Sequence, residues 1–183
     1  MWKKNSISWN SLIGGYVRQG LGRRALEEFD RMMNSGFRPN QVTFVNILYV
    51  CSDSGLVEEG ERHFNSMDQK YKILAGLEHY ACIVEIYGKA GQLDKAEKLI
   101  KGMPFGPDVI VWEAFSRAFC LHSGLELCEF ATEGISKLKM NYPAAFSAVI
   151  RPILKHGRGV VLTELRPLKQ MKEKGKYFKT DGS

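Results

Sequence analysis

The chain has 183 residues, of which 44% are hydrophobic, and its formal net charge is +6. This apolar content allows a continuous core and excludes a largely disordered chain, and the length fits one domain of ordinary size. No apolar run approaches the roughly 20 residues of a membrane span, and the first residues lack the apolar segment of a secretory signal. We therefore expect no membrane partner.

The positive charge is concentrated toward the carboxyl end of the chain. Residues 1–150 hold 17 basic and 17 acidic residues, whereas residues 151–179 hold nine basic and two acidic ones. A basic segment of this kind suits contact with a polyanion. The alternative is a solvated, poorly packed tail, and composition alone does not separate the two.

A helical hairpin pattern recurs along the chain, and its clearest example spans residues 78–100. Apolar residues recur there at steps of three and four, the pattern breaks around Gly91, and a second apolar stripe follows. Such an arrangement is typical of two helices joined by a turn. A small residue in the first turn of each second helix marks the interval between the hairpins: Ala25, Gly60, Ala96 and Cys128.

These four small residues are separated by steps of 35, 36 and 32 residues. A helix-turn-helix unit that repeats at this interval predicts an α-solenoid. A small side chain at this point would let the second helix approach the first closely. We therefore predict an all-α fold, a right-handed α-solenoid of about five helix-turn-helix repeats with a concave face for a ligand.

Particular stretches resemble pentatricopeptide repeats of the plant PLS subclass. They are SWNSLIGGYVRQGLGRRALEEFDRMMNSGFRPNQVTF, LVEEGERHFNSM, EHYACIVEIYGKAGQLDKAEKLIKGMPFGPDVIVWEA and LHSGLELCE. The resemblance is close over residues 6–142 and looser beyond. It implies a P repeat at 6–40, an L repeat at 41–76, an S repeat at 77–108, an E1 motif at 109–142, a diverged E2 motif at 143–179 and a tail at 180–183.

The resemblance also implies a function. Members of this subclass are organellar RNA-binding factors in which each repeat faces one base with two side chains. It thus implies sequence-specific binding of single-stranded RNA in a mitochondrion or plastid, supporting C-to-U RNA editing by positioning a separate DYW-type deaminase. The implied partners are organellar RNA, editing accessory proteins and that deaminase acting in trans. The alternative is an adaptor scaffold of the editing complex with little RNA binding of its own.

Carried over by alignment, the two base-facing positions fall on one pair of residues in each of the first three repeats. The pairs are Asn10 with Asn40, Val45 with Gly76, and Ala81 with Asp108. Two asparagines imply a pyrimidine, with C favoured over U, and an amide can both donate to and accept from a base edge. Val45 is expected to sandwich bases rather than to read them, and Gly76 offers no side-chain hydrogen bond.

Each polar member of these pairs also has a structural interpretation. Asn10 would suit the start of a helix, where asparagine is a favoured cap. Asn40 follows Pro39 and would suit a turn or a cap, and Asp108 after Pro107 is a common turn pair. The resemblance favours RNA contact for Asn10 and Asn40 and leaves Asp108 open between the two roles.

The charge of the concave face discriminates between the two functions. RNA binding predicts a positive concave face that presents Asn10 and Asn40. An adaptor scaffold predicts a neutral concave face, with the positive charge confined to the tail.

The sequence lacks the signatures of catalytic and metal sites. The H-x-E and P-C-x-x-C elements of a zinc deaminase do not occur, nor do the P-loop, nucleophile-elbow and H-E-x-x-H motifs. We expect no enzyme activity, no cofactor, no metal and no small-molecule substrate. The cysteines are expected to be reduced, mostly buried thiols, with a zinc site as the alternative, and the histidines to be structural or surface residues: Cys51, Cys82, Cys120, Cys128, His63, His79, His122 and His156.

Overall fold

A computed structural model describes residues 5–122 and residue 134. Between residues 5 and 122 the chain forms seven α-helices and no strand. They are α1 (Ser6–Arg18), α2 (Gly22–Asn34), α3 (Gln41–Ser54), α4 (Val57–Gln69), α5 (Leu77–Lys89), α6 (Leu93–Lys101) and α7 (Val109–His122). None of these helices is long and apolar enough to cross a lipid bilayer. The unit expected at 143–179, and most of the unit expected at 109–142, lie outside the described residues.

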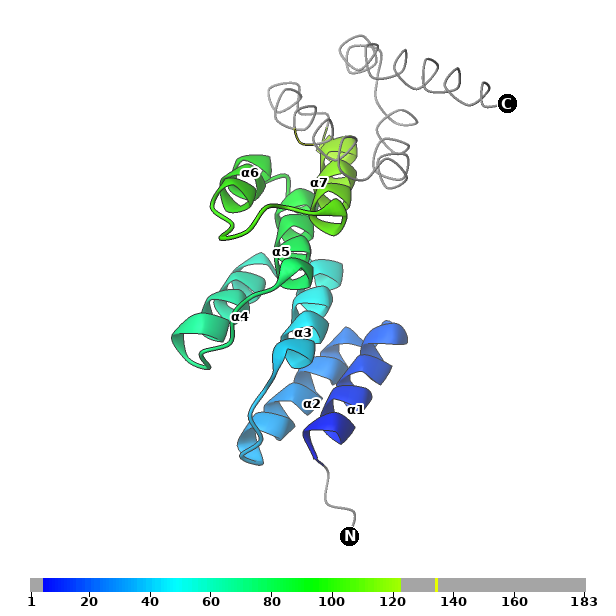
Figure 1. The fold of residues 1–183 in the computed structure, drawn as a ribbon. Helices are drawn as coiled ribbons and strands as arrows, with labels where there is room; N and C mark the ends of the chain where they lie inside the picture. Colours follow the sequence, from blue (N-terminus) through cyan, green and yellow to red (C-terminus); the bar gives the residue numbers. More distant parts are fainter. Residues whose placement is uncertain (1–4, 123–133, 135–183) are drawn as a thin grey trace, which may run out of the picture.

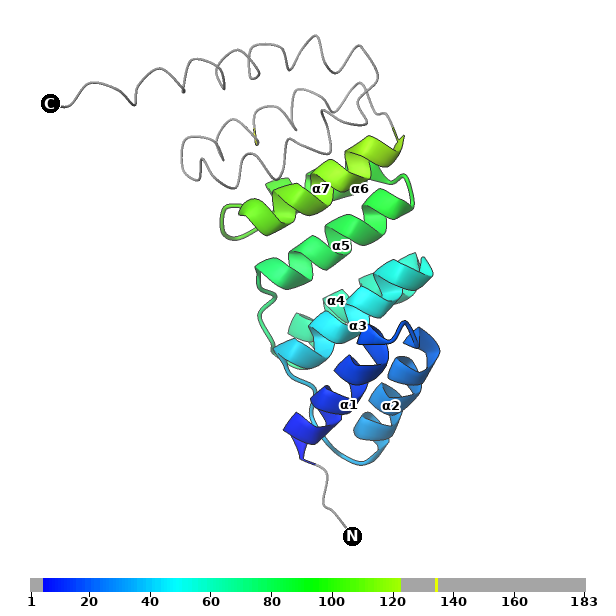
Figure 2. The ribbon, with the colours of Figure 1, turned by 90° about the vertical axis from the view of Figure 1, so that its right-hand side faces the viewer.

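The helices pair into antiparallel hairpins that stack in chain order (Figure 1). Helix α1 packs on α2, α3 on α4 and α5 on α6, and each odd-numbered helix also contacts the next odd-numbered helix. The odd-numbered helices therefore form one layer, with the even-numbered helices behind them (Figure 2). This two-layer stack is an α-solenoid, so the predicted fold class is confirmed.

Each hairpin turns on a glycine with left-handed backbone. Gly20, Gly55 and Gly91, which follow α1, α3 and α5, have φ angles of 70°, 69° and 72°. Other residues rarely adopt this conformation, whereas glycine adopts it at little cost. The breaks that the sequence pattern shows between paired helices are thus three copies of one turn.

An aromatic residue occupies the fourth position of each odd-numbered helix. In α1, α3 and α5 this residue contacts an aromatic ring that follows the second helix of the same hairpin. The ring centroids of Trp9 and Phe37 are 6.2 Å apart, those of Phe44 and Tyr71 5.5 Å, and those of Tyr80 and Phe105 5.6 Å. Such pairs add to the stability gained by burial alone. They hold the last residues of each repeat near the start of its own first helix, which is where the alignment places the base-facing pairs.

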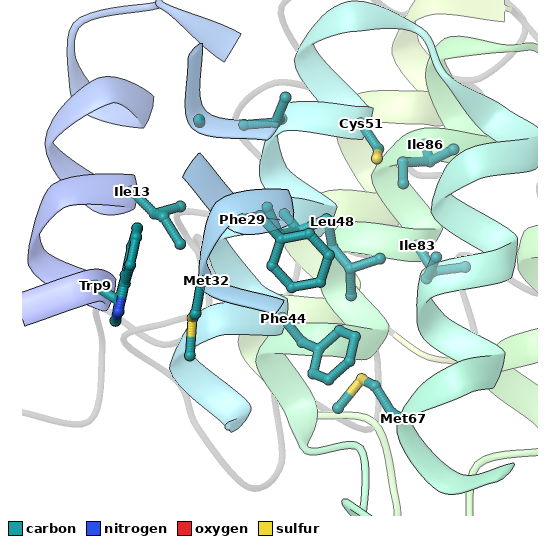
Figure 3. Packing of buried hydrophobic residues seen from close by; sticks show 13 residues of the cluster. Trp9, Ile13, Phe29, Met32, Phe44, Leu48, Cys51, Met67, Ile83 and Ile86 are labelled. Atoms are coloured by element: carbon teal, nitrogen blue, oxygen red, sulfur yellow. The ribbon is translucent and has the colours of Figure 1, made fainter. Parts of the chain in front are cut away.

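The hydrophobic core runs without interruption from α1 to α5 (Figure 3). Ile13, Phe44 and Leu48 have no exposed surface in it. Two of the small residues that mark the repeat, Ala25 and Ala96, are also fully buried. Because this core crosses every boundary between neighbouring hairpins, no hairpin buries its apolar face alone.

Gly60 shows that the small residues serve contacts between repeats as well as within them. A Cβ atom at Gly60 would lie 3.4 Å from Cβ of Cys51 on α3, the first helix of its own hairpin, but 2.6 Å from Cδ1 of Ile86 on α5. The tightest approach is therefore to the following repeat. The remaining marker, Cys128, lies outside the described residues.

Candidate nucleic-acid interface

Asn40 caps the amino end of α3. Its Oδ1 atom accepts the backbone N–H of Thr43 at 3.1 Å, and its own backbone N–H donates to Oγ1 of Thr43 at 3.0 Å. This reciprocal pair is a capping box, which satisfies two backbone donors at the helix start. The cap role considered for Asn40 is therefore real. It uses only the oxygen of the amide, because Nδ2 of the exposed Asn40 makes no hydrogen bond to any residue that the structure describes.

Asn10 lies within α1 and is not a cap. The cap of α1 is Asn5, whose side chain accepts the backbone N–H of Ser8, so the structural interpretation of Asn10 is wrong. Instead, Nδ2 of Asn10 donates to Oδ1 of Asn40 at 3.0 Å. The structure thus brings the first predicted pair into direct contact across 30 residues of sequence.

Thr43 completes the network around these two amides. Its hydroxyl donates to Oδ1 of Asn10 at 2.6 Å, and its side chain is fully buried between α1 and α3. Sequence analysis did not single out Thr43. The available signal was local, because an asparagine followed three residues later by a threonine before an apolar run resembles a capping box. Its contact with Asn10, 33 residues away, had no such signal.

The other two predicted pairs offer much less polar surface. Val45 is half-buried, and Gly76 caps α5 with its backbone alone. Ala81 is only 7% exposed. Oδ1 of Asp108 accepts the backbone N–H groups of Ile110 and Val111 at 3.0 and 3.3 Å. Asp108 therefore caps α7, a structural role that differs from the turn considered for it, and no hydrogen bond joins it to Ala81 in the described part of the chain.

His79 occupies in α5 the place that Thr43 occupies in α3. Its Nδ1 atom accepts the backbone N–H of Gly76 at 3.0 Å, and its Nε2 atom lies 3.0 Å from the backbone oxygen of Gln41. Because Nδ1 accepts, the ring proton is on Nε2, which donates to Gln41. His79 is 1% exposed, so it is a structural histidine that joins the starts of α3 and α5.

Three exposed aliphatic residues, which sequence analysis missed, recur beside the predicted pairs. They occupy the second position of α1, α3 and α7: Ile7, Val42 and Ile110 are 74%, 56% and 46% exposed. Single exposed apolar residues are ordinary. Because these three recur at the same helix position, they give the layer of odd-numbered helices a row of exposed apolar side chains. Val42 is more exposed than Val45, which makes it the better candidate for contact with a flat base. The corresponding residue of α5 is Glu78.

The layer of odd-numbered helices carries almost balanced charge. Nζ of Lys89 lies 3.3 Å from Glu85 and 4.0 Å from Asp53. Arg117 lies 3.3 Å from Glu85 and 3.4 Å from Glu113. These contacts form a chain of ion pairs from α3 through α5 to α7, which we call the ion-pair ladder. The odd-numbered helices hold three basic residues (Arg18, Lys89 and Arg117) and four acidic ones (Asp53, Glu78, Glu85 and Glu113).

Within the described residues, the layer of odd-numbered helices is therefore not a positive face. The basic segment at 151–179 lies outside them. No group of three or more His, Cys, Asp or Glu side chains in the described part could hold a metal ion. Cys51 and Cys82 are free thiols whose pKa is raised to about 12 mainly by burial, so both are protonated at neutral pH.

Helical hairpins that stack on their neighbours and share one core define an α-solenoid repeat protein. The sequence matches a family model described as "PPR repeat family" over residues 4–53, and one described as "PPR repeat" over residues 42–71 and 78–104. The chain belongs to the pentatricopeptide repeat family.

Similar proteins include several from Arabidopsis thaliana. The chain is 43% identical over 174 residues to Pentatricopeptide repeat-containing protein At3g49170, chloroplastic. The matched region covers 95% of this chain and 20% of that protein. It is 46% identical over 140 residues to Pentatricopeptide repeat-containing protein At1g56690, mitochondrial, covering 76% of this chain and 20% of that protein. The chain thus spans about a fifth of the length of these relatives.

Among solved structures, the chain resembles the pentatricopeptide repeat protein PPR10 in complex with an 18-nt psaJ RNA element. The TM-score is 0.71 and the identity 17%, over 91% of this chain and 24% of that chain. PPR10 from maize gives a TM-score of 0.67 at 17% identity, over 96% of this chain and 26% of that chain. At this identity the likeness concerns the fold.

Proposed function

We propose that this chain binds single-stranded RNA and that Asn10 and Asn40 together contact one base. The observation that carries the proposal is the hydrogen bond between the two amides, which joins residues from the beginning and the end of one repeat. Asn40 is exposed and Asn10 half-buried, so N–H groups of the pair remain available to a base edge. The preferred base is a pyrimidine, with C favoured over U.

The apolar side chains beside this pair would hold the base in place. Ile7 precedes Asn10 by one helical turn, and Val42 lies two residues after Asn40. Both are more than half exposed. A base between them could make apolar contact with its two faces while its edge meets the amides. RNA recognition commonly combines such face contacts with hydrogen bonds to the edge of an unstacked base.

The cellular role is a second part of the proposal. Three repeats contact too few bases to define one site, because a short word occurs many times in a genome, so the target requires further repeats or partners. The names of the relatives, chloroplastic and mitochondrial, favour an organelle. We place the chain in C-to-U editing, as a scaffold rather than an enzyme, positioning a DYW-type deaminase in trans with accessory proteins. This role rests on the resemblance of residues 109–179 to E motifs.

The ion-pair ladder favours a second candidate, an adaptor scaffold with little RNA binding of its own. A face that attracts phosphates would show an excess of lysine and arginine. Here Lys89 and Arg117 already have carboxylate partners, and acidic residues outnumber basic ones on the odd-numbered helices. Such a face suits a protein partner better than a polyanion.

Titration with short RNAs tests the choice between these functions. Fluorescence anisotropy would compare labelled oligo-C, oligo-U and oligo-A at two salt concentrations, with double-stranded RNA as the control. Base contact predicts saturable binding that prefers pyrimidines and keeps this preference at the higher salt. Binding that ignores sequence and disappears at high salt would be electrostatic only, which would overturn the base-contact proposal and favour the adaptor.

A further inference from the structure

We infer that Thr43 sets the base preference of the first repeat, because it holds the amides of Asn10 and Asn40 so that their carbonyl oxygens have partners and the groups left without one are N–H donors. This inference rests on the proposed RNA binding and deepens it. Thr43 has no exposed surface, so it cannot contact RNA itself. It is a positioning residue, and it acts through the orientation of two other side chains.

The orientation of the Asn40 amide follows from a backbone donor. The oxygen and nitrogen of an amide have nearly the same shape, so their positions are assigned from hydrogen-bond partners. The backbone N–H of Thr43, 3.1 Å from the Asn40 side chain, can only be met by an oxygen. Oδ1 of Asn40 therefore faces the start of α3, and Nδ2 occupies the other branch of the amide.

The orientation of Asn10 follows from that of Asn40. Because Oδ1 of Asn40 also meets the Asn10 side chain at 3.0 Å, the group of Asn10 at that contact must be Nδ2. Oδ1 of Asn10 then faces the Thr43 hydroxyl at 2.6 Å. This hydroxyl accepts the backbone N–H of Asn40 at 3.0 Å, and its single proton can point to Oδ1 of Asn10 at 2.6 Å or to Oδ1 of Asn40 at 3.1 Å. The shorter distance favours donation to Asn10.

The network therefore gives each carbonyl oxygen a partner and leaves N–H groups without one. One N–H of Asn10 and two N–H groups of Asn40 remain, and none of them has a hydrogen-bond partner among the described residues. Cytosine presents two neighbouring acceptors on its Watson–Crick edge, O2 and N3, whereas uracil carries an N–H donor at N3. A pair whose unpartnered groups are donors matches cytosine at both atoms and opposes uracil at N3.

The next junction supplies an internal comparison. His79 takes the place of Thr43 there, but Gly76 replaces Asn40 and Val45 replaces Asn10. His79 therefore caps its helix with no amide to orient. A change at His79 should disturb the repeat junction without altering the choice between C and U at the first repeat.

The test compares Thr43→Val, Thr43→Ser and His79→Gln with the wild-type chain. Each protein is titrated with two single-stranded RNAs that differ by C or U at one position. Valine keeps the shape of threonine but loses the hydroxyl, so Oδ1 of Asn10 loses its donor and only the contact with Asn40 still holds the Asn10 amide. We expect Thr43→Val to reduce the ratio of the two Kd values several-fold toward one, Thr43→Ser to keep it, and His79→Gln to leave it unchanged. All titrations are made below the onset of thermal unfolding of the least stable variant.

A second measurement on the wild-type chain does not depend on a variant that folds. Side-chain amide resonances of Asn10 and Asn40 in ¹⁵N-labelled protein should both shift when the C-containing RNA is added, and if neither shifts the inference is overturned. A wild-type preference that Thr43→Val retains in full would also overturn it, while leaving the proposed function intact. A wild-type chain with no preference at all would remove the proposed base contact and this inference with it.

Discussion

Nδ2 of Asn10 donates a hydrogen bond of 3.0 Å to Oδ1 of Asn40, so one repeat is closed by a contact between its second helical turn and its last residue. Oδ1 of Asn40 also accepts from the backbone of Thr43. The half of the Asn40 amide that remains for a ligand is therefore a donor, and its replacement by an acceptor should change the preferred base.

Asn40→Asp makes this replacement. One carboxylate oxygen can keep the contacts with Thr43 and Asn10, while the other replaces Nδ2 with an acceptor that suits the N3–H of uracil. We expect the preference to move from C toward U by about tenfold, because one mismatched polar contact costs roughly 1–3 kcal/mol. Aspartate is also a good helix cap, so thermal stability should change little.

Asn5→Asp is the matched control for Asn40→Asp. Asn5 caps α1 through its side chain, as Asn40 caps α3, and its side chain makes no hydrogen bond to Asn10. It adds the same charge and should leave the ratio of the Kd values for C and U unchanged. Equal effects of the two variants would show that charge, and not the geometry of the Asn10–Asn40 pair, controls the preference.

The ion-pair ladder predicts a gain of binding when its acids are neutralised. Glu85→Gln combined with Glu113→Gln removes two negative charges and frees Lys89 and Arg117 from their nearest carboxylates. If RNA binds along the layer of odd-numbered helices, its affinity at low salt should rise several-fold. The slope of log K against log salt concentration, where K is the association constant, should become steeper by about one to two. These pairs are partly exposed, so the stability cost should be at most ~1 kcal/mol.

The control for the ladder is the same charge change on the other layer. Glu58 of α4 and Asp94 of α6 are exposed, and Glu58→Gln combined with Asp94→Asn leaves the ladder intact. If both double variants bind RNA equally, the phosphates do not contact the layer of odd-numbered helices. Such a result would favour the adaptor candidate.

Gly60→Ala tests the close contact between α4 and α5. The added methyl would lie 2.6 Å from Cδ1 of Ile86, a side chain that is only 2% exposed. Alanine favours the helix by about 1 kcal/mol, but overpacking typically costs 1–3 kcal/mol, so we expect net destabilisation of roughly 1 kcal/mol in denaturant unfolding. Ile86→Val removes the clashing atom and should rescue Gly60→Ala. Strictly additive effects of the two changes would argue against the contact.

His63 should make stability depend on pH. The His63 ring is largely buried, and its centroid lies 5.5 Å from that of the Phe29 ring. This burial lowers the pKa of His63 below its usual 6.5, although the Glu59 carboxylate, 3.7 Å away, raises it. Arg62 lowers this pKa further and Asp30 raises it. As pH falls through the unfolded-state pKa near 6.5, the unfolded chain takes up a proton that the folded chain does not yet bind. Stability is therefore complete at neutral pH and is lost as the pH falls toward the folded-state pKa.

Thermal unfolding of His63→Gln and the wild-type chain between pH 7.5 and 5 measures this effect. The wild-type chain should lose more stability on acidification than the variant does. Other titrating groups remain in both proteins, so the difference between the two curves reports His63. Parallel curves would show that burial does not shift its pKa.

The fold could be predicted because its signals are local and repeated. The apolar steps that end near Gly20, Gly55 and Gly91 are visible within each hairpin, and their regular spacing indicates stacking. The contact between Asn10 and Asn40 was accessible only through the family resemblance, since no local pattern links residues 30 positions apart.

What the sequence did not predict depends on how neighbouring repeats face one another. The contact of Thr43 with Asn10 and that of His79 with Gln41 each join two repeats. The sequence around an apolar residue such as Ile7 does not tell whether the residue is buried or exposed. The packing of the helices shows that Ile7 is 74% exposed. The charges of the ion-pair ladder were likewise visible in the sequence, but their pairing between helices was not.

The base preference of the double variant Asn10→Ala/Asn40→Ala shows whether these two amides contact a base. The wild-type chain and the variant are titrated with RNAs that differ by C or U at one position. The matched control is Asn34→Ala/Asn65→Ala, which removes two exposed asparagines from the even-numbered helices. We expect the wild-type chain and the control to prefer C and Asn10→Ala/Asn40→Ala to lose this preference. The same preference in all three proteins would contradict it.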